Sequence, residues 1–241
     1  MDYDIEQETI LLKAKIFIEA NDYSEACNLI ENYIKKLERD LTIDERNTFT
    51  ISFHNLINEK IDNWRKLTKI INKEQLRESD DDIIFNDINV KKILENDIQN
   101  ICERVISIID NYLLHKYDTY ESQIIYLKTK GDYYRIQYSI LENSNIEFKN
   151  YAKNCYKNAY ESSKKLSDTN TYKLSFILSY GVFYYEFLNE PTTSINLVKS
   201  AYNEAITKID SLNDRMYKES TRILKLMKKN MELWEREVNA E

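Results

Sequence analysis

Residues 42–78 read TIDERNTFTISFHNLINEKIDNWRKLTKIINKEQLRE and carry an apolar stripe along their length. The apolar residues recur at intervals of three and four, which places them on one face of a helix of about eight turns. They are Phe49, Phe53, Leu56, Ile57, Trp64, Leu67, Ile70 and Ile71. At the start, Thr42 and Glu45 have the spacing of a capping box, in which a hydroxyl and a carboxylate each satisfy a free backbone amide. The stretch predicts a long helix that begins here and ends near Glu78.

The residues on either side of this stretch predict more helix. In residues 1–40 the apolar period breaks near Asn21-Asp22-Tyr23, which indicates a helical hairpin. After the stretch, the aspartates of Ser79-Asp80-Asp81-Asp82 compete for backbone hydrogen bonds and repel one another, so we expect an acidic loop over 79–85. An acidic ligand mimic is the less favoured reading of that loop.

The rest of the chain continues the helical pattern. Helices are predicted over 86–114, from near Tyr120, and over 145–166, 170–189, 191–209 and 213–237, with Pro191 in a first turn, where no amide hydrogen is needed. Two glycines and one proline in 241 residues leave little material for turns and sheets. The prediction is an all-α fold of nine antiparallel helices in a bundle or solenoid. An array of tetratricopeptide repeats is the alternative, although the fragment 20–26 does not recur at the required period.

Composition also limits the class of function. The formal charge is −7, without a basic stripe, which argues against nucleic-acid binding. No run of some 18 apolar residues is present, and the acidic start Met1-Asp2-Tyr3-Asp4 does not resemble a signal peptide. We expect an intracellular protein, in the cytoplasm with the nucleus as an alternative, that does not act at a membrane.

Cysteine and histidine usage predicts neither an enzyme nor a metal protein. Cys27, Cys102 and Cys155 are widely spaced and form no CxxC pair, so we interpret them as reduced core thiols. His54 and His115 lie far apart, which disfavours a zinc site or a cysteine–histidine nucleophile. No glycine-rich phosphate loop appears, so we expect no catalytic residues, no cofactor and no metal.

Three motifs, in this order, resemble one known family. They are YLKTKGDYYR at 126–135, VFYYE at 182–186, and YKEST at 217–221 leading to NMELW at 230–234. The chain is similar to the 14-3-3 family over nearly its whole length. The resemblance implies a single domain over 1–241, shaped as a nine-helix cup with a concave ligand groove. Residues 42–237 would form the groove, and a 14-3-3-like protein would bind phosphoserine or phosphothreonine peptides there.

The same resemblance implies that the phosphate pocket is altered. His54 stands where the family has Lys, Ile61 where it has Arg, and Ile136 where it has Tyr, whereas the family's other Arg is kept as Arg135. Arg65 lies on the same helix face as His54, so Arg65 and a protonated His54 are candidates for compensation. The alternative reading is that His54 is a neutral groove residue and Arg65 a solvated surface charge.

The peptide groove outside the phosphate pocket resembles the family more closely. Of two Asn side chains that hold the peptide backbone, one is kept as Asn230 and the other is replaced by Ser179. The positions that match the groove walls are Lys128, Leu178, Glu186, Leu226, Leu233 and Trp234. We therefore expect the amphipathic groove to be retained.

The resemblance places a dimer interface in the N-terminal hairpin, and there too the charges differ. Asp22 would lie opposite Asp97, and Glu25 opposite Ile93, where the family pairs opposite charges. Each surface ion pair contributes only about 0 to 1 kcal/mol, so apolar contacts can still hold a homodimer. A heterodimer with another 14-3-3 protein is the alternative.

Together these features predict a divergent, non-enzymatic 14-3-3-like adaptor that docks extended segments of partner proteins. Its phosphate recognition would be weakened or altered. The alternative is a regulatory or structural subunit that acts mainly through homo- or heterodimerisation with a typical 14-3-3 protein.

Overall fold

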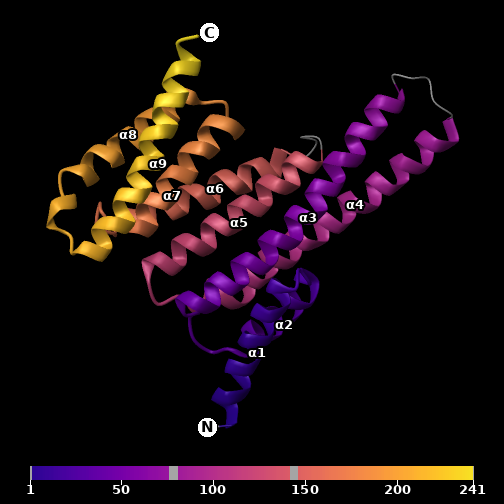
Figure 1. Cartoon of the computed structure of the whole chain (residues 1–241), viewed down its shortest axis with the longest axis horizontal. Helices are drawn as coiled ribbons and strands as arrows, with labels where there is room; N and C mark the ends of the chain where they lie inside the picture. The colour runs from indigo at the N-terminus through magenta and orange to yellow at the C-terminus, as the bar shows by residue number, and fades with distance from the viewer. Residues whose placement is uncertain (1, 76–80, 142–145, 241) are drawn as a thin grey trace. The chain divides into compact units, whose positions relative to one another are not determined.

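The computed structural model describes residues 2–75, 81–141 and 146–240. Within these ranges the chain forms nine α-helices and no strand, as predicted (Figure 1). The helices are α1 (Asp2–Glu19), α2 (Tyr23–Lys36), α3 (Ile43–Gln75), α4 (Asp81–Ile108), α5 (Tyr120–Ile140), α6 (Ile146–Ser163), α7 (Thr171–Val182), α8 (Pro191–Ile206) and α9 (Asp214–Val238). Single π-helical turns follow α4 and α7 at Ile109–Leu113 and Phe183–Phe187, and a 3-10 turn lies at Ile209–Ser211. None of the helices in the described ranges is apolar over enough of its length to cross a membrane.

Local capping accounts for the two helix starts that the sequence marked most clearly. The Thr42 backbone amide donates to the Glu45 carboxylate at 2.7 Å, and the Glu45 amide donates to the Thr42 hydroxyl at 3.3 Å. This reciprocal pair confirms the predicted capping box. Between α1 and α2, Asn21 has a φ of 59°, and the Asp22 side chain caps α2 by accepting from the Glu25 amide at 3.1 Å. The predicted hairpin is thus confirmed.

The start of α4 differs from the prediction. Residues 81–85, expected in an acidic loop with the next helix starting near Asn86, belong to α4, which begins at Asp81. Negative charge near the first turn of a helix is favourable, because free amides there carry partial positive charge, and the prediction weighed only the repulsion between aspartates. Residues 79 and 80, and the predicted helix end near Glu78, lie outside the described residues.

The chain divides into two compact units. The first contains residues 1–118 and 129–153, and the second contains residues 119–128 and 154–241. In the first unit α3 packs along α4 as an antiparallel pair, and α2 packs on α1 and α3 (Figure 1). Its core is built from the stripe of α3 and from facing residues of α2 and α4. Fully buried examples are Ile30, Phe49, Phe53, Ile57 and Ile98.

The core of the second unit is aromatic. The ring of Tyr156 on α6 stacks on Phe183 with centroids 4.3 Å apart, and Tyr180 on α7 adds a further parallel ring at 5.6 Å from Tyr156. Gly181 lies where α7 meets α8, and the Ser194 hydroxyl of α8 donates to its carbonyl at 2.7 Å. A Cβ at position 181 would lie 2.4 Å from Val198 Cγ2, so only glycine permits this approach of the two helices.

Candidate functional site

One face of α3 carries the first group of candidate residues. Ile61 follows His54 by two helical turns and precedes Arg65 by about one turn, so the three side chains share a face. His54 and Arg65 are exposed, whereas Ile61 is only 8% exposed and packs inward. A hydrogen bond of 2.9 Å joins His54 Nε2 to the Asn58 amide, and Arg65 lies 3.4 Å from Asp62. The middle of this face is therefore apolar and its two ends are polar.

Arg135 and Ile136 lie on the part of α5 that belongs to the first unit. The Arg135 guanidinium is 40% exposed and lies 4.0 Å from the Asp132 carboxylate one turn earlier on the same helix. Ile136 is half-buried. Nearby, Lys130 makes a closer ion pair, with both oxygens of Asp110 at 2.6 and 2.7 Å. Arg135 is thus only loosely held.

The cationic candidates of the first unit make their polar side-chain contacts within their own helices. Among the described residues, no hydrogen bond or ion pair links His54 or Arg65 to Arg135. His54, Arg65 and Arg135 are therefore not held together by polar contacts with one another. A ligand anion would have to order them at a cost in side-chain entropy.

The second group of candidates belongs to the second unit. On α7 the Ser179 hydroxyl donates to the Ser175 carbonyl at 3.1 Å, and Leu178 beside it is half-buried. Glu186 lies exposed in the π-helical turn that follows, and Lys128 is half-buried on α5. These side chains offer one hydroxyl and two opposite charges.

A stripe on α9 combines apolar and amide side chains. Leu226 and Leu233 are each 48% exposed. Asn230 lies between them, one turn from each, and its side-chain amide donates to the Leu226 carbonyl at 2.9 Å. The stripe can therefore present two apolar surfaces with one hydrogen-bonding group between them.

Trp234 differs from its neighbours on α9. It is only 3% exposed, and its ring stacks on Tyr185 with centroids 5.1 Å apart and planes 17° from parallel. Tyr185 also donates a hydrogen bond to Glu237. Trp234 was expected among the groove walls, but within this unit it belongs to the core and supports the helix that carries Leu233.

The candidate dimer residues lie on α2 and α4 of the first unit. Asp22 and Glu25 lie at the start of α2, where Asp22 is the helix cap. On α4, Ile93 is 60% exposed, and Asp97 forms an ion pair of 2.8 Å with Lys60 of α3. The sequence interpretation missed this pair, because Lys60 and Asp97 are 37 positions apart in the chain. The pair gives the Asp97 carboxylate a cation within its own chain.

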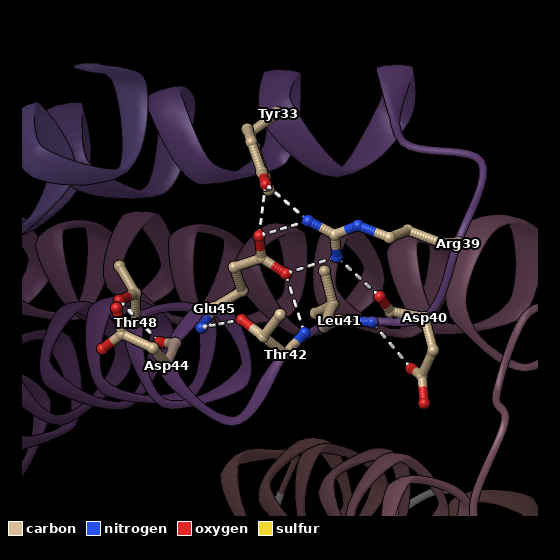
Figure 2. Close-up of polar contacts among 8 residues, drawn as sticks. All are labelled: Tyr33, Arg39, Asp40, Leu41, Thr42, Asp44, Glu45 and Thr48. Atoms are coloured by element: carbon tan, nitrogen blue, oxygen red, sulfur yellow. Dashed lines mark hydrogen bonds and ion pairs between the residues drawn. The ribbon is translucent and has the colours of Figure 1, made fainter. Parts of the chain in front are cut away.

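A polar network lies at the connection between α2 and α3 (Figure 2). The guanidinium of Arg39 donates to both oxygens of Glu45 at 2.8 Å, and the Tyr33 hydroxyl donates to the same carboxylate. Burial would raise the pKa of Glu45, but the hydrogen bonds from Arg39 and Tyr33 outweigh it and lower the pKa to about 2. Burial and the bond to Glu45 raise the pKa of Tyr33 to about 12. The network fixes the hairpin to the long helix and includes no candidate site residue.

The cysteines are free and buried, which confirms their reading as core thiols. Burial raises the pKa of Cys27 to about 12 and that of Cys102 well above its ordinary value. Such thiols are poor nucleophiles, because the reactive form is the thiolate. In the described ranges, histidines, cysteines and carboxylates form no group that could hold a metal ion.

The sequence profile of the 14-3-3 protein family matches residues 13–235. The 14-3-3-like protein RA215 of Solanum tuberosum is 33% identical to the chain, over 95% of the chain and 90% of that protein. The 14-3-3-like protein GF14 nu of Arabidopsis thaliana is 34% identical, over 98% of the chain and 89% of its own length. 14-3-3 protein 5 of Solanum lycopersicum is also 34% identical, over 95% and 90% respectively.

Proposed function

The chain belongs to the 14-3-3 family, and from this membership we propose that it is a non-enzymatic adaptor with weakened or altered phosphate recognition. Membership supports an adaptor role in which phosphopeptides are bound. In this proposal the chain differs from typical family members in how strongly it recognises the phosphate. It still docks extended segments of partner proteins. Partners would be phosphorylated segments bound with reduced affinity, or unphosphorylated acidic segments.

Ile61 is the observation that carries the proposal. It is an apolar side chain, 8% exposed, at the position where the motif resemblance implies an arginine in the family. A hydrogen bond to a charged group contributes about 1.5 to 3 kcal/mol, and isoleucine donates none. With His54 and Ile136 also altered, two or three donors are lost. Phosphopeptide affinity should then fall roughly a hundredfold to ten-thousandfold below that of an unaltered pocket.

The remaining residues support docking without a full phosphate pocket. Leu226 and Leu233 expose apolar surface, with the Asn230 amide between them. In the first unit Arg135 and Arg65 keep permanent charges that could attract an acidic side chain. We further propose that the protein acts in the cytoplasm, with the nucleus as an alternative, because free cysteines are the normal state in those reducing compartments.

Restoring the family's donors tests the proposal. His54→Lys, Ile61→Arg and Ile136→Tyr are combined in one variant, and its affinity for an arginine-rich phosphoserine peptide is measured by fluorescence anisotropy. We expect a gain of about a thousandfold over the natural chain, since each of the three restored donors strengthens binding by roughly tenfold. Ile51→Arg is the matched control, because it adds a charge at another isoleucine of α3, 45% exposed, and should change affinity little.

Folding of the restored variant is checked by circular dichroism before binding is interpreted, because Ile61 is buried. If the triple variant is unfolded, the double variant His54→Lys with Ile136→Tyr replaces it, with a gain of about a hundredfold expected. A folded variant that binds no tighter than the natural chain would contradict the proposal.

A second function is favoured by the exposed apolar residues of the first unit. Leu12 and Ile16 on α1 are 59% and 57% exposed, and Val90 and Ile93 on α4 are 48% and 60% exposed. A regulatory subunit that dimerises with a typical 14-3-3 protein would cover such residues. Sedimentation of the chain mixed with a typical 14-3-3 protein tests this role, and the absence of any mixed species would exclude it.

A further inference from the structure

A cleft of about 520 Å³ opens in the first unit among α3, α4 and α5. Its apolar wall comes from all three helices and consists of Ile71, Ile88, Ile140 and Leu141. Ile71 and Ile140 are each only 5% exposed, so they form a fixed floor as part of the core. The volume lies within the range of roughly 300 to 1,000 Å³ that is typical of small-molecule sites. The described lining is divided equally between four apolar and four polar residues.

The described residues of the cleft's rim carry more positive than negative charge. Lys91, Lys92 and Glu95 line it, so two ammonium groups stand against one carboxylate. Glu95 is already engaged, because one of its oxygens accepts from the Trp64 ring nitrogen at 3.0 Å and lies 3.6 Å from Lys91. Lys91 also lies over the Trp64 ring, 5.5 Å from its centroid. These contacts hold Lys91, Glu95 and the Trp64 ring in place, and Lys91 offsets the negative charge of Glu95.

Lys92 is the group that the arrangement leaves available. Its side chain is exposed, and no hydrogen bond or ion pair to another described residue engages its ammonium. Asn72 lies exposed on the α3 side of the cleft and can donate or accept. The cleft thus places one exposed lysine and one exposed amide beside an apolar floor.

We propose that this cleft binds a small anionic amphiphile, a molecule with an aliphatic or aromatic body and one carboxylate or phosphate group. The body lies against Ile71, Ile88 and Ile140, where each buried methylene contributes favourably. The anionic group lies near Lys92 and Asn72. Among the described lining residues Glu95 is the one anionic side chain, and it is held by Lys91 and Trp64.

The cleft is distinct from the candidate docking residues on the same helix. Asn72 follows Ile61 by eleven residues, which corresponds to about 16 Å along α3. None of the residues that line the cleft belongs to the candidate phosphate or peptide positions. Ligand binding here can therefore be measured independently of peptide binding.

Octanoate, with octanol as its neutral counterpart, is the probe for the test. Protein-observed amide NMR should show saturable one-site binding of octanoate, with the largest shifts at Ile71, Ile88 and Ile140. Lys92→Gln should weaken octanoate binding by about three- to tenfold, because a partly exposed charge-assisted contact is lost. Octanol should bind the natural chain and Lys92→Gln equally, and more weakly than octanoate binds the natural chain.

Two further variants make the test selective. Lys66→Gln removes an exposed lysine of α3 outside the cleft and should leave octanoate affinity unchanged. Asn72→Trp should fill the mouth of the cleft and prevent octanoate from binding. A well-dispersed amide spectrum of this variant would show that it is still folded. The proposal is overturned if octanoate does not saturate, if the shifts centre on α9, or if Lys92→Gln binds octanoate as tightly as the natural chain.

Discussion

Glu45 shows how a single residue acquires a role that its local sequence only partly reveals. The spacing of Thr42 and Glu45 predicted the capping box, and both reciprocal hydrogen bonds are present. The same carboxylate also accepts from Arg39 and Tyr33 (Figure 2). No pattern in the sequence predicted those partners, because they depend on how the connection after α2 folds back toward α3.

Replacing Glu45 by Gln should destabilise the protein in a pH-dependent manner. The pKa of Glu45 lies near 2 in the folded chain, below the ordinary value of 4.5, so ionisation favours folding. The contribution, about 3 kcal/mol, is fully present above about pH 4.5 and is lost as pH falls toward 2. Denaturant unfolding of the natural chain and of Glu45→Gln at several pH values measures it.

The difference between the two proteins should narrow as the pH falls below 4.5. Glu59→Gln, an exposed glutamate on the same helix, serves as control and should cause no such change. A constant difference from pH 7 to pH 3 would show that the charge of Glu45 is not what stabilises the connection.

Residue identities in the candidate site could be read from the motifs, whereas their surroundings could not. The register of the family motifs identified His54, Ile61 and Arg135, but their exposure depends on the packing of neighbouring helices. Trp234 illustrates the difference, since its motif suggested a groove wall and its ring lies against Tyr185 in the core. Motifs specify which side chain is present, and tertiary packing decides which surface it offers.

At the scale of helices, the periodicity of apolar residues predicted the nine helices of the described residues but not the start of α4. The long apolar stripe predicted α3 because burying one face of a helix is the main source of its stability in a protein. The acidic stretch was harder to assign, since the same aspartates repel one another and favour a helix start. That balance placed the beginning of α4 at Asp81 and not near Asn86.

Gly181 offers a test of helix packing in the second unit. Gly181→Ala should lower the free energy of unfolding by about 1 to 3 kcal/mol, because the new Cβ would lie 2.4 Å from Val198 Cγ2. The higher helix propensity of alanine opposes this effect by about 1 kcal/mol, so any net loss reports a larger clash. Ser175→Ala, at an exposed position of α7, is the control. A Gly181→Ala variant that is about 1 kcal/mol more stable than the natural chain, as helix propensity alone would give, would refute close packing at this position.

At the scale of the whole molecule, the predicted homodimer should depend on apolar contacts more than on ion pairs. Ile93 is 60% exposed, and Asp97 already has Lys60 as its partner. Sedimentation velocity should show that Ile93→Asp weakens the dimer at least tenfold, because an apolar side chain is replaced by a charge that would need to be buried. Ile206→Asp, at an isoleucine of α8 that is 43% exposed, should have no effect.

Salt provides a second criterion for the dimer. Raising sodium chloride to 0.5 M screens exposed ion pairs but not apolar contacts, so the dissociation constant should change little. A dimer that dissociates in salt, or one that Ile206→Asp disrupts as much as Ile93→Asp, would contradict an interface that depends on apolar contacts of α4.

The measurement that tests the central claim most directly compares two peptides on the natural chain. An arginine-rich phosphoserine peptide and its unphosphorylated twin are titrated by fluorescence anisotropy at pH 7.5. We expect the phosphate to add less than about tenfold to affinity at pH 7.5, because Ile61 and Ile136 donate no hydrogen bonds. A preference of tenfold or more at pH 7.5 would show a working phosphate pocket and contradict the proposed loss.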